Sequence, residues 1–312
     1  MWQALHIGIF TIAGRERGVL MHKKKDYWIA AGFLLPAVAL MTVFVMYPII
    51  DNVILSFHSW NGIYGAAREF VGMENYGKIL GNSSFQRSLL NSGIFLVVGF
   101  LIQMPLSFLL ALLVSSGLRG AKMFRTFYYL PVILGTTTVA VMWKNLMNPN
   151  YGVLLELVRK MQFDRLDFDW LNTPWVNVWV AALVNCWKSA GYNMLIFCAG
   201  LVTIPKELHE AALIDGCSGW QRVRYITLPL SKNSFKVYAI LCITGCIKTF
   251  DMVWAMTAGG PNATSATPAI LLYLNAYSFK LMGRGASIAV ILLILGVALS
   301  VLCNKVFRQE EY

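Results

Sequence analysis

Polar side chains recur at helical spacing inside one strongly apolar stretch of the sequence. This stripe consists of Asn185, Lys188, Ser189 and Tyr192, at positions i, i+3, i+4 and i+7 of one helical face. Their amide, ammonium and hydroxyl groups can form hydrogen bonds with a polar molecule. In lipid such groups are unfavourable unless they face protein or a water-filled path. The stripe therefore indicates either a solute path or a hydrogen-bonded helix interface, and its spacing leaves both open.

A second stripe repeats the i, i+4, i+7 spacing in a later apolar stretch, with Cys242, Cys246 and Thr249. By the same argument we expect the two stripes to point inward and towards each other. Lys188 has a separate alternative, because its long side chain can reach the membrane surface or pair with a partner subunit.

Side chains suited to catalysis or metal binding are scattered. The four histidines, His6, His22, His58 and His209, include no pair at helical ligand spacing, so we expect no metal site. Neither Gly259–Gly260 nor Gly283–Arg284–Gly285 is followed by the Lys-Ser/Thr of a phosphate-binding loop. The six cysteines have no regular spacing and are expected to be free thiols. The sequence therefore predicts no enzyme and no cofactor, and any ATP hydrolysis would belong to another chain.

Composition places these residues in a membrane protein. Apolar residues make up 57% of the 312 positions and charged residues 13%, against about 45–50% and about 25% in soluble domains. The net charge of +11 comes from Lys and Arg that punctuate apolar runs, so it does not indicate a nucleic-acid partner. The bilayer is the expected surrounding.

Six stretches are long and apolar enough to cross the hydrocarbon layer as helices, which needs about 20 residues each. They are residues 27–48, 88–116, 127–147, 175–204, 235–256 and 285–307. The fifth contains Lys248 and Asp251, three positions apart, for which an ion pair is favoured over an ion-binding site.

Lys and Arg predict the orientation, because cytoplasmic loops are enriched in both. The short loop between the second and third spans has Arg119, Lys122 and Arg125 and no acid. Both termini are therefore expected in the cytoplasm. Residues 1–20 are too short an apolar patch to span and lack a cleavage site, so we expect an upstream extension before a natural start at Met21.

The inner loop between the fourth and fifth spans reads EAALIDGCSGWQRVRYITLP from Glu210 to Pro229. Carboxylates in the first turns favour a short helix, and Gly216 can take the left-handed conformation that ends it. A second amphipathic piece, 220–226, should follow until Pro229 stops it. The loop thus predicts a short helical hairpin that can dock on a partner protein.

This loop resembles the EAA motif of binding-protein-dependent ABC importer permeases: EAA, three residues, Gly, nine residues, Ile, any residue, Leu-Pro. The matching positions are Glu210, Ala211, Ala212, Gly216, Ile226, Leu228 and Pro229, with Asp215 beside the glycine. In the family such a loop couples the permease to its ATPase. The segments MTAGGPNATSATPAILLYLNAYSFKLMGRGASIAV and RGAKMFRTFYYLPVILGTTTVAVMWKNLMNPNYGVL, from Met256 and Arg119, resemble the maltose-type sugar branch.

The resemblance implies an all-α polytopic fold of six transmembrane helices with a type I importer (MetI-like) core. It divides the chain into a cytoplasmic segment 1–26, a first helix and outer loop 27–87, a permease core 88–307 with coupling loop 205–230, and a tail 308–312. The implied partners are a homologous second permease, two ATP-binding-cassette subunits and an external solute-binding protein, in the cytoplasmic membrane of a bacterium.

The resemblance further implies sugar contacts at Asn185, Ser189, Cys242, Cys246 and Thr249, counted from Glu210. Several members of the branch have more polar residues where the two cysteines lie, so the particular sugar does not follow. The alternative is an ion-coupled secondary transporter, which usually buries acids at mid-membrane and shows internal repeats. Asp251 is the one acid inside a predicted span.

Overall fold

The structure is a computed structural model that describes residues 27–306 except 28, 30 and 117–119. The predicted cytoplasmic segment 1–26, the start at Met21 and the tail 308–312 lie outside the described residues. The chain forms two compact units, residues 1–54 and 55–312, which are described separately.

The first unit contains most of an apolar helix that runs from Ala31 to Ser56. Its last two residues, Leu55 and Ser56, belong to the second unit. It includes the π turn η1 (Thr42–Met46) and helix α2 (Tyr47–Ser56). The span was predicted to end at Pro48, but the helix continues eight residues beyond it.

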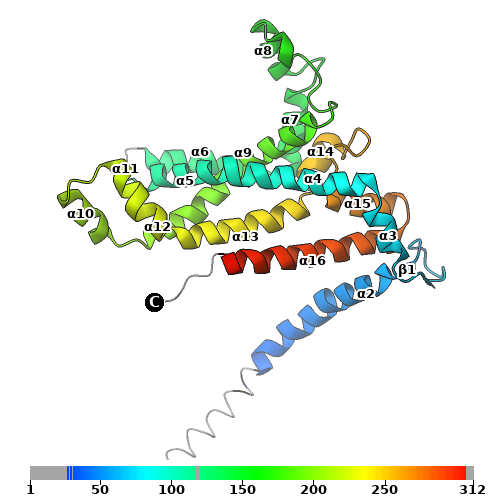
Figure 1. Cartoon of the computed structure of the whole chain (residues 1–312). Coiled ribbons are helices and arrows are strands. Elements are labelled where there is room, and N and C mark those ends of the chain that lie inside the picture. Colours follow the sequence, from blue (N-terminus) through cyan, green and yellow to red (C-terminus); the bar gives the residue numbers. More distant parts are fainter. Residues whose placement is uncertain (1–26, 28, 30, 117–119, 307–312) are drawn as a thin grey trace, which may run out of the picture. The chain divides into compact units, whose positions relative to one another are not determined.

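The second unit is a helical bundle with a small antiparallel pair of strands near its start (Figure 1). Its first elements are β1 (His58–Ser59), β2 (Glu69–Phe70), α3 (Glu74–Leu80), α4 (Ser83–Val98), η2 (Gly99–Gln103), α5 (Met104–Ser115), α6 (Ala121–Ile133), α7 (Thr136–Leu146), α8 (Val153–Lys160), η3 (Asp164–Leu166) and α9 (Val176–Val202). There follow α10 (Lys206–Ile214), α11 (Gly219–Arg222), η4 (Val223–Thr227), α12 (Leu228–Leu230), α13 (Lys232–Lys248), α14 (Asp251–Thr257), α15 (Pro268–Tyr273), η5 (Leu274–Ser278) and α16 (Met282–Val306).

The predicted spans are all found as helical segments. Within the described residues, the single helices Ala31–Ser56, Ser83–Ser115 and Met282–Val306 are long and apolar enough to cross a membrane, as are two bent pairs if each counts as one span. The predicted fourth span is α9, whose 27 residues reach about 40 Å at about 1.5 Å per residue. Its mean hydropathy is lower than that of the three helices named above, because its interior contains Asn and Lys side chains.

The third predicted span, residues 127–147, is a bent pair of helices and not one straight helix. Helices α6 and α7 meet at an angle of 93°. Leu134 and Gly135 between them both have extended backbone, with ψ of 138° and 140°. Two successive extended residues interrupt the i to i+4 hydrogen bonds, so the chain leaves one helix axis and starts another.

The fifth span also bends, by 41°, between α13 and α14. Thr249 has ψ of 118°, and the helix restarts at Asp251. The predicted ion pair between Lys248 and Asp251 is therefore wrong: the two residues occupy different helices, and no ion pair joins them among the described contacts. The Thr249 carbonyl accepts a hydrogen bond of 2.6 Å from the Thr267 hydroxyl instead.

Among the prolines inside helical stretches, three follow a π turn, with one residue between the turn and the proline. Pro48 follows η1, Pro105 follows η2 and Pro229 follows η4. In each case the residue between them donates its N–H to the carbonyl five positions back. The wider turn moves the helical carbonyls away from the proline ring, which would clash in a regular α-helix. The second arm ends at Leu230, one residue beyond its predicted stop at Pro229, and a turn at Ser231 separates it from α13.

The core of the second unit is built on α9. Helix α5 and helix α6 pack against it, and α13 packs between α9 and α16. One buried cluster joins α4, α9 and α14 through Phe95, Val178 and Met252, and another joins α5, α9 and α13 through Phe108, Phe197 and Tyr238. Figure 1 shows α10 and α11 at one end of this bundle and α14 and α15 at the other.

Two buried asparagines hold the loop between α14 and α15. Asn91 donates its side-chain N–H groups to the carbonyls of Thr264 and Ala266, over 2.9 and 2.8 Å. Asn177 donates to the Gly260 carbonyl over 3.0 Å and to the Thr264 hydroxyl over 2.9 Å. The loop can be buried because these amides satisfy its backbone polar groups.

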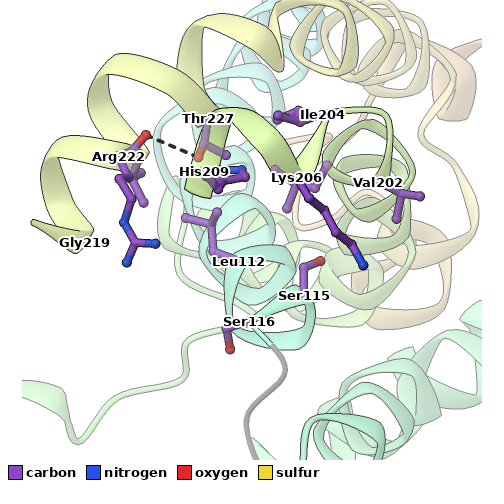
Figure 2. Close-up of a pocket in the computed structure, with 12 residues that line it drawn as sticks. Leu112, Ser115, Ser116, Val202, Ile204, Lys206, His209, Gly219, Arg222 and Thr227 are labelled. Carbon is purple, nitrogen blue, oxygen red and sulfur yellow. Dashed lines mark hydrogen bonds between the residues drawn. The ribbon is translucent and has the colours of Figure 1, made fainter. Parts of the chain in front are cut away.

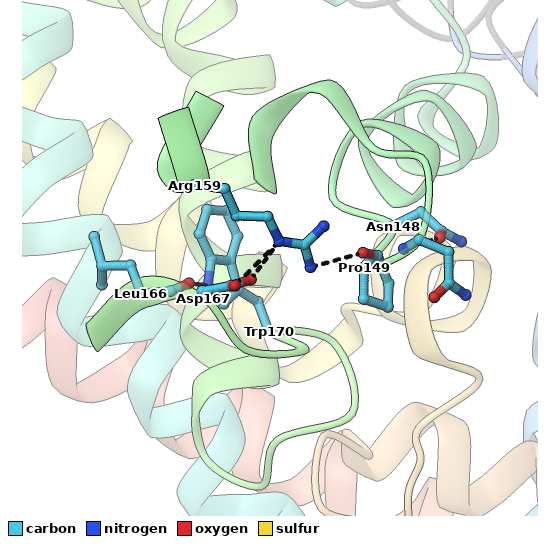
Figure 3. Close-up of polar contacts among 7 residues, drawn as sticks. Asn148, Pro149, Arg159, Leu166, Asp167 and Trp170 are labelled. Atoms are coloured by element: carbon cyan, nitrogen blue, oxygen red, sulfur yellow. Dashed lines mark hydrogen bonds and ion pairs between the residues drawn. The ribbon is translucent and has the colours of Figure 1, made fainter. Parts of the chain in front are cut away.

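The segment between α7 and α9 is organised by one arginine (Figure 3). The Arg159 Nε donates to both carboxylate oxygens of Asp167, over 2.9 and 3.1 Å, and its Nη2 donates to the Pro149 carbonyl over 3.0 Å. The hydrogen bond and charge of Asp167 raise the pKa of Arg159, and Lys160 lowers the pKa of Glu156 in the same way. The indole N–H of Trp170 donates to the Leu166 carbonyl over 2.9 Å.

Candidate functional site

The predicted hairpin forms at one end of the bundle, and Gly216 ends its first helix. Gly216 has φ of +74°. Its N–H donates to the Leu213 carbonyl over 3.1 Å, and the Cys217 N–H donates to the Ala212 carbonyl over 2.9 Å. This pair of bonds is the Schellman motif, in which a left-handed residue satisfies the last carbonyls of a helix. The backbone angle explains why the position holds glycine.

The second arm of the hairpin begins with a capping box. The Ser218 hydroxyl accepts from the Gln221 N–H over 3.3 Å, and the Gln221 side chain accepts from the Ser218 N–H over 2.7 Å. Both bonds satisfy backbone donors that a helix start leaves free. The two arms are therefore separated by only Asp215 to Ser218, and the turn is specified at both ends.

The hairpin presents a mixed polar and apolar surface. Ala212 is buried, whereas Glu210, Ala211 and Asp215 are exposed. Ile226 is half-buried, and Leu228 and Pro229 are exposed. Large apolar side chains on the same hairpin are exposed as well: Leu213, Ile214, Trp220 and Tyr225. Exposed apolar side chains gathered at a helix end are typical of a protein interaction site.

At the level of the first stripe, a polar cluster connects three helical segments. The Gln103 amide donates to the Ser189 hydroxyl over 2.8 Å, and Ser189 donates to the Asn185 carbonyl. Tyr238 donates to the Gly99 carbonyl over 2.7 Å and contacts Gln103 Oε1 at 3.2 Å. Gln103 and Tyr238 are both buried. We call Gln103, Ser189 and Tyr238 the polar cluster.

The structure brings the two stripes near each other through this cluster. Cys242 lies against Gly99, where an added Cβ would come within 2.4 Å of the Cys242 Sγ. Cys242 and Cys246 have their sulfur atoms 4.0 Å apart. Among the described residues no hydrogen bond joins one stripe directly to the other. The Thr249 hydroxyl donates to the Gly245 carbonyl of its own helix, over 3.0 Å.

The remaining stripe residues differ in burial. Asn185 and Lys188 are half-buried, and Tyr192 is 48% exposed. Among the described hydrogen bonds, none joins Tyr192 to the polar cluster. Sequence reasoning missed Gln103 and Tyr238, although a glutamine inside an apolar stretch is the kind of signal that marked Asn185.

Close packing of α9 depends on two of its glycines. A Cβ at Gly191 would lie 2.1 Å from the Tyr128 carbonyl oxygen, and one at Gly200 would lie 1.8 Å from the Ser234 hydroxyl. Small residues at these points let α6 and α13 approach α9 closely. The described residues contain no group of three His, Cys, Asp or Glu side chains that could hold a metal ion.

The family of binding-protein-dependent transport system inner membrane components matches residues 12–308. The chain belongs to this family. It is therefore an inner-membrane permease, from a family of transport proteins rather than enzymes.

Relatives of the chain match along most of their length. A probable ABC transporter permease of Pyrococcus horikoshii is 33% identical over 85% of this chain and 90% of its own. The probable ABC transporter permease YurN of Bacillus subtilis is 30% identical over 89% and 96%. The trehalose/maltose transport system permease MalF of Thermococcus litoralis is 28% identical over 89% and 93%.

Solved structures share the fold. A chain of a bacterial ABC transporter that imports the acidic polysaccharide alginate matches with a TM-score of 0.80 and 20% identity, over 94% of this chain and 99% of that chain. A chain of the MetNI methionine ABC transporter matches with a TM-score of 0.53, over 75% and 97%. The predicted all-α, type I importer fold is thereby confirmed.

Proposed function

We propose that this chain is the permease subunit of an ATP-driven importer that carries a sugar or short oligosaccharide. The observation that carries the proposal is the hairpin of α10 and α11 on a chain of this family. Its Schellman turn at Gly216 and its capping box make it rigid, and it exposes both carboxylates and apolar side chains. Relatives named for trehalose/maltose and lactose transport support a sugar as the substrate.

The proposed assembly contains one copy of this chain, a homologous permease, two ATP-binding-cassette subunits and an external solute-binding protein. A matching structure is a bacterial alginate transporter in complex with a pentasaccharide-bound periplasmic protein. The coupling surface consists of Glu210, Ala211, Ala212, Asp215, Gly216, Ile226, Leu228 and Pro229. The proposal includes both termini in the cytoplasm, as the Lys and Arg distribution predicts, and no catalysis by the chain itself.

The proposed substrate path runs along α9 and α13. Its residues are Asn185, Lys188, Ser189, Tyr192, Cys242, Cys246 and Thr249, and we add Gln103 because its amide bonds to the Ser189 hydroxyl. The cluster lies in the middle of these helices, while the hairpin lies at their end. Sugar recognition and ATPase coupling therefore involve separate residues.

Reconstitution tests the proposal. The chain would be co-expressed with the second permease, ATPase and binding protein encoded beside it, and placed in vesicles. We expect ATP-dependent uptake of sugars from a panel of mono-, di- and oligosaccharides, and no ATP hydrolysis by the chain alone. Uptake driven by an ion gradient without ATP or binding protein would refute the proposal.

A further inference from the structure

A cavity of about 560 Å³ lies behind the hairpin, between its two arms and the ends of α5 and α9 (Figure 2). Its volume lies within the range of small-molecule sites. The polar cluster, in the middle of α9, takes no part in its lining. The cavity is therefore a separate site.

The polar part of the lining is basic. Lys206, His209 and Arg222 line the cavity with the hydroxyl-bearing Ser115 and Ser116, and no acidic residue does. Figure 2 shows Lys206 and Arg222 on opposite sides, with His209 between them. Such a set of donors suits the oxygens of a phosphate group.

Arg222 adds an independent indication of an anion. Its Nε is buried and has no hydrogen-bond partner in the described part of the chain. A buried guanidinium nitrogen without an acceptor is costly, and an anionic ligand would supply that acceptor. By contrast Arg224, two residues on, is exposed, with its guanidinium carbon 5.9 Å from the Tyr225 ring centroid, and does not line the cavity.

The rest of the lining is apolar and lies at the end of membrane-crossing helices. Leu112, Leu201 and Val202 line the cavity, and Val202 is 82% exposed. The apolar helix that includes α5 ends at Ser115, so we expect the basic side chains at the level where lipid headgroups meet the hydrocarbon layer. Basic pockets between transmembrane helices at this depth bind anionic headgroups.

We propose that this cavity binds one anionic phospholipid, with its phosphate between Lys206, His209 and Arg222 and its acyl chains along Leu112 and Val202. Because Lys206 and His209 belong to α10 and Arg222 to α11, the lipid would connect both arms of the hairpin to the bundle. The chain would thus sense lipid charge at the element that faces its ATPase.

Lipid retention by the purified full-length chain tests this. The chain would be incubated with phosphatidylglycerol or phosphatidylcholine and bound lipid measured by native mass spectrometry. We expect selective retention of phosphatidylglycerol, which Arg222→Gln should reduce about fivefold, the contribution of one basic residue near an anionic surface. The matched variant Arg224→Gln should retain lipid as the parent does.

Two further measurements identify whether the phosphate belongs to a lipid or is free in solution. Inorganic phosphate should not displace bound phosphatidylglycerol, and Val202→Asp should reduce lipid retention by opposing the acyl chains. Equal retention of the two lipids, equal losses in the two arginine variants, or displacement by inorganic phosphate would overturn the proposal. Circular dichroism and thermal unfolding of each variant would show that it is folded.

Discussion

The side-chain amide of Gln103 donates a hydrogen bond to the hydroxyl of Ser189 across the contact between α4–α5 and α9. Gln103→Leu keeps the approximate volume and removes this donor, so the half-buried Ser189 hydroxyl loses one of its hydrogen bonds. The loss of one such bond costs about 1 kcal/mol, or about fivefold in an equilibrium constant. We expect weaker or altered sugar uptake, measured as KM for the transported sugar in reconstituted vesicles.

The matched control for Gln103 is Gln86→Leu, because Gln86 is exposed and its side chain donates to the Leu80 carbonyl, away from the polar cluster. Asn185→Ala should likewise weaken sugar uptake or reduce the range of sugars transported. Stimulation of ATP hydrolysis by the loaded binding protein should survive in part, because the site and the hairpin are separate. If alanine at Asn185, Ser189 and Thr249 together changed neither rate nor preference, this substrate path would be wrong.

The turn at Gly216 predicts a sharp difference between substitutions. A Cβ there would meet no atom within 4 Å, so any loss reflects the positive φ of +74° alone. Left-handed backbone costs about 1–2 kcal/mol for most residues, and asparagine tolerates it better than valine. We therefore expect Gly216→Val to abolish coupled uptake and Gly216→Asn to retain most of it, with equal amounts of protein in the membrane.

Measuring ATP hydrolysis as well as uptake distinguishes a Gly216 variant that fails to couple the two from one that fails to assemble with the ATPase. Glu210→Lys, at the exposed carboxylate of the same hairpin, should also abolish uptake. Normal transport by both Gly216→Val and Glu210→Lys would show that the hairpin is not the coupling element.

The contact of Gly191 with α6 predicts a stability effect. Gly191→Ala would place Cβ 2.1 Å from the Tyr128 carbonyl oxygen, so α6 and α9 must separate. Overpacking of this kind costs about 1–3 kcal/mol. Gly93→Ala is the control, since a Cβ at this helical position meets nothing within 4 Å. Thermal unfolding in detergent should show a lower Tm for the first variant only.

The loop between α14 and α15 depends on Asn177. Asn177→Leu would leave the buried Thr264 hydroxyl without this donor, whereas the Gly260 carbonyl still accepts from the Ser265 hydroxyl. An unsatisfied buried group costs about 1–3 kcal/mol. We expect faster proteolysis of this loop, whereas Asn172→Leu, at an exposed site, should leave it unchanged. Equal protection in both variants would contradict this role.

Thiol labelling tests the orientation. Cys217 lies in the hairpin turn and is partly exposed. In a variant with Cys217 as its single cysteine, an impermeant reagent should label broken cells and not intact ones. Tyr151→Cys in a cysteine-free background is the opposite control, because Tyr151 lies between α7 and α8 and is 68% exposed. Labelling of Cys217 in intact cells would reverse the whole orientation.

The sequence by itself determined the membrane-spanning helices, the hairpin and the glycine that ends its first helix. These follow from local physics: apolar length, helical spacing and the backbone freedom of glycine at position 216. The family also followed from one loop, because its fixed positions lie within 20 residues of each other.

Only the tertiary structure decided where helices bend and which polar groups meet. The first span was predicted to end at Pro48, but a π turn before this proline lets the helix continue to Ser56. Lys248 and Asp251 were predicted to pair, but the break at Thr249 puts them on separate helices. Gln103 lies 86 positions from Ser189, so no local pattern relates them. Their contact follows from the packing of α5 against α9, which sums many weak side-chain contacts across the whole bundle.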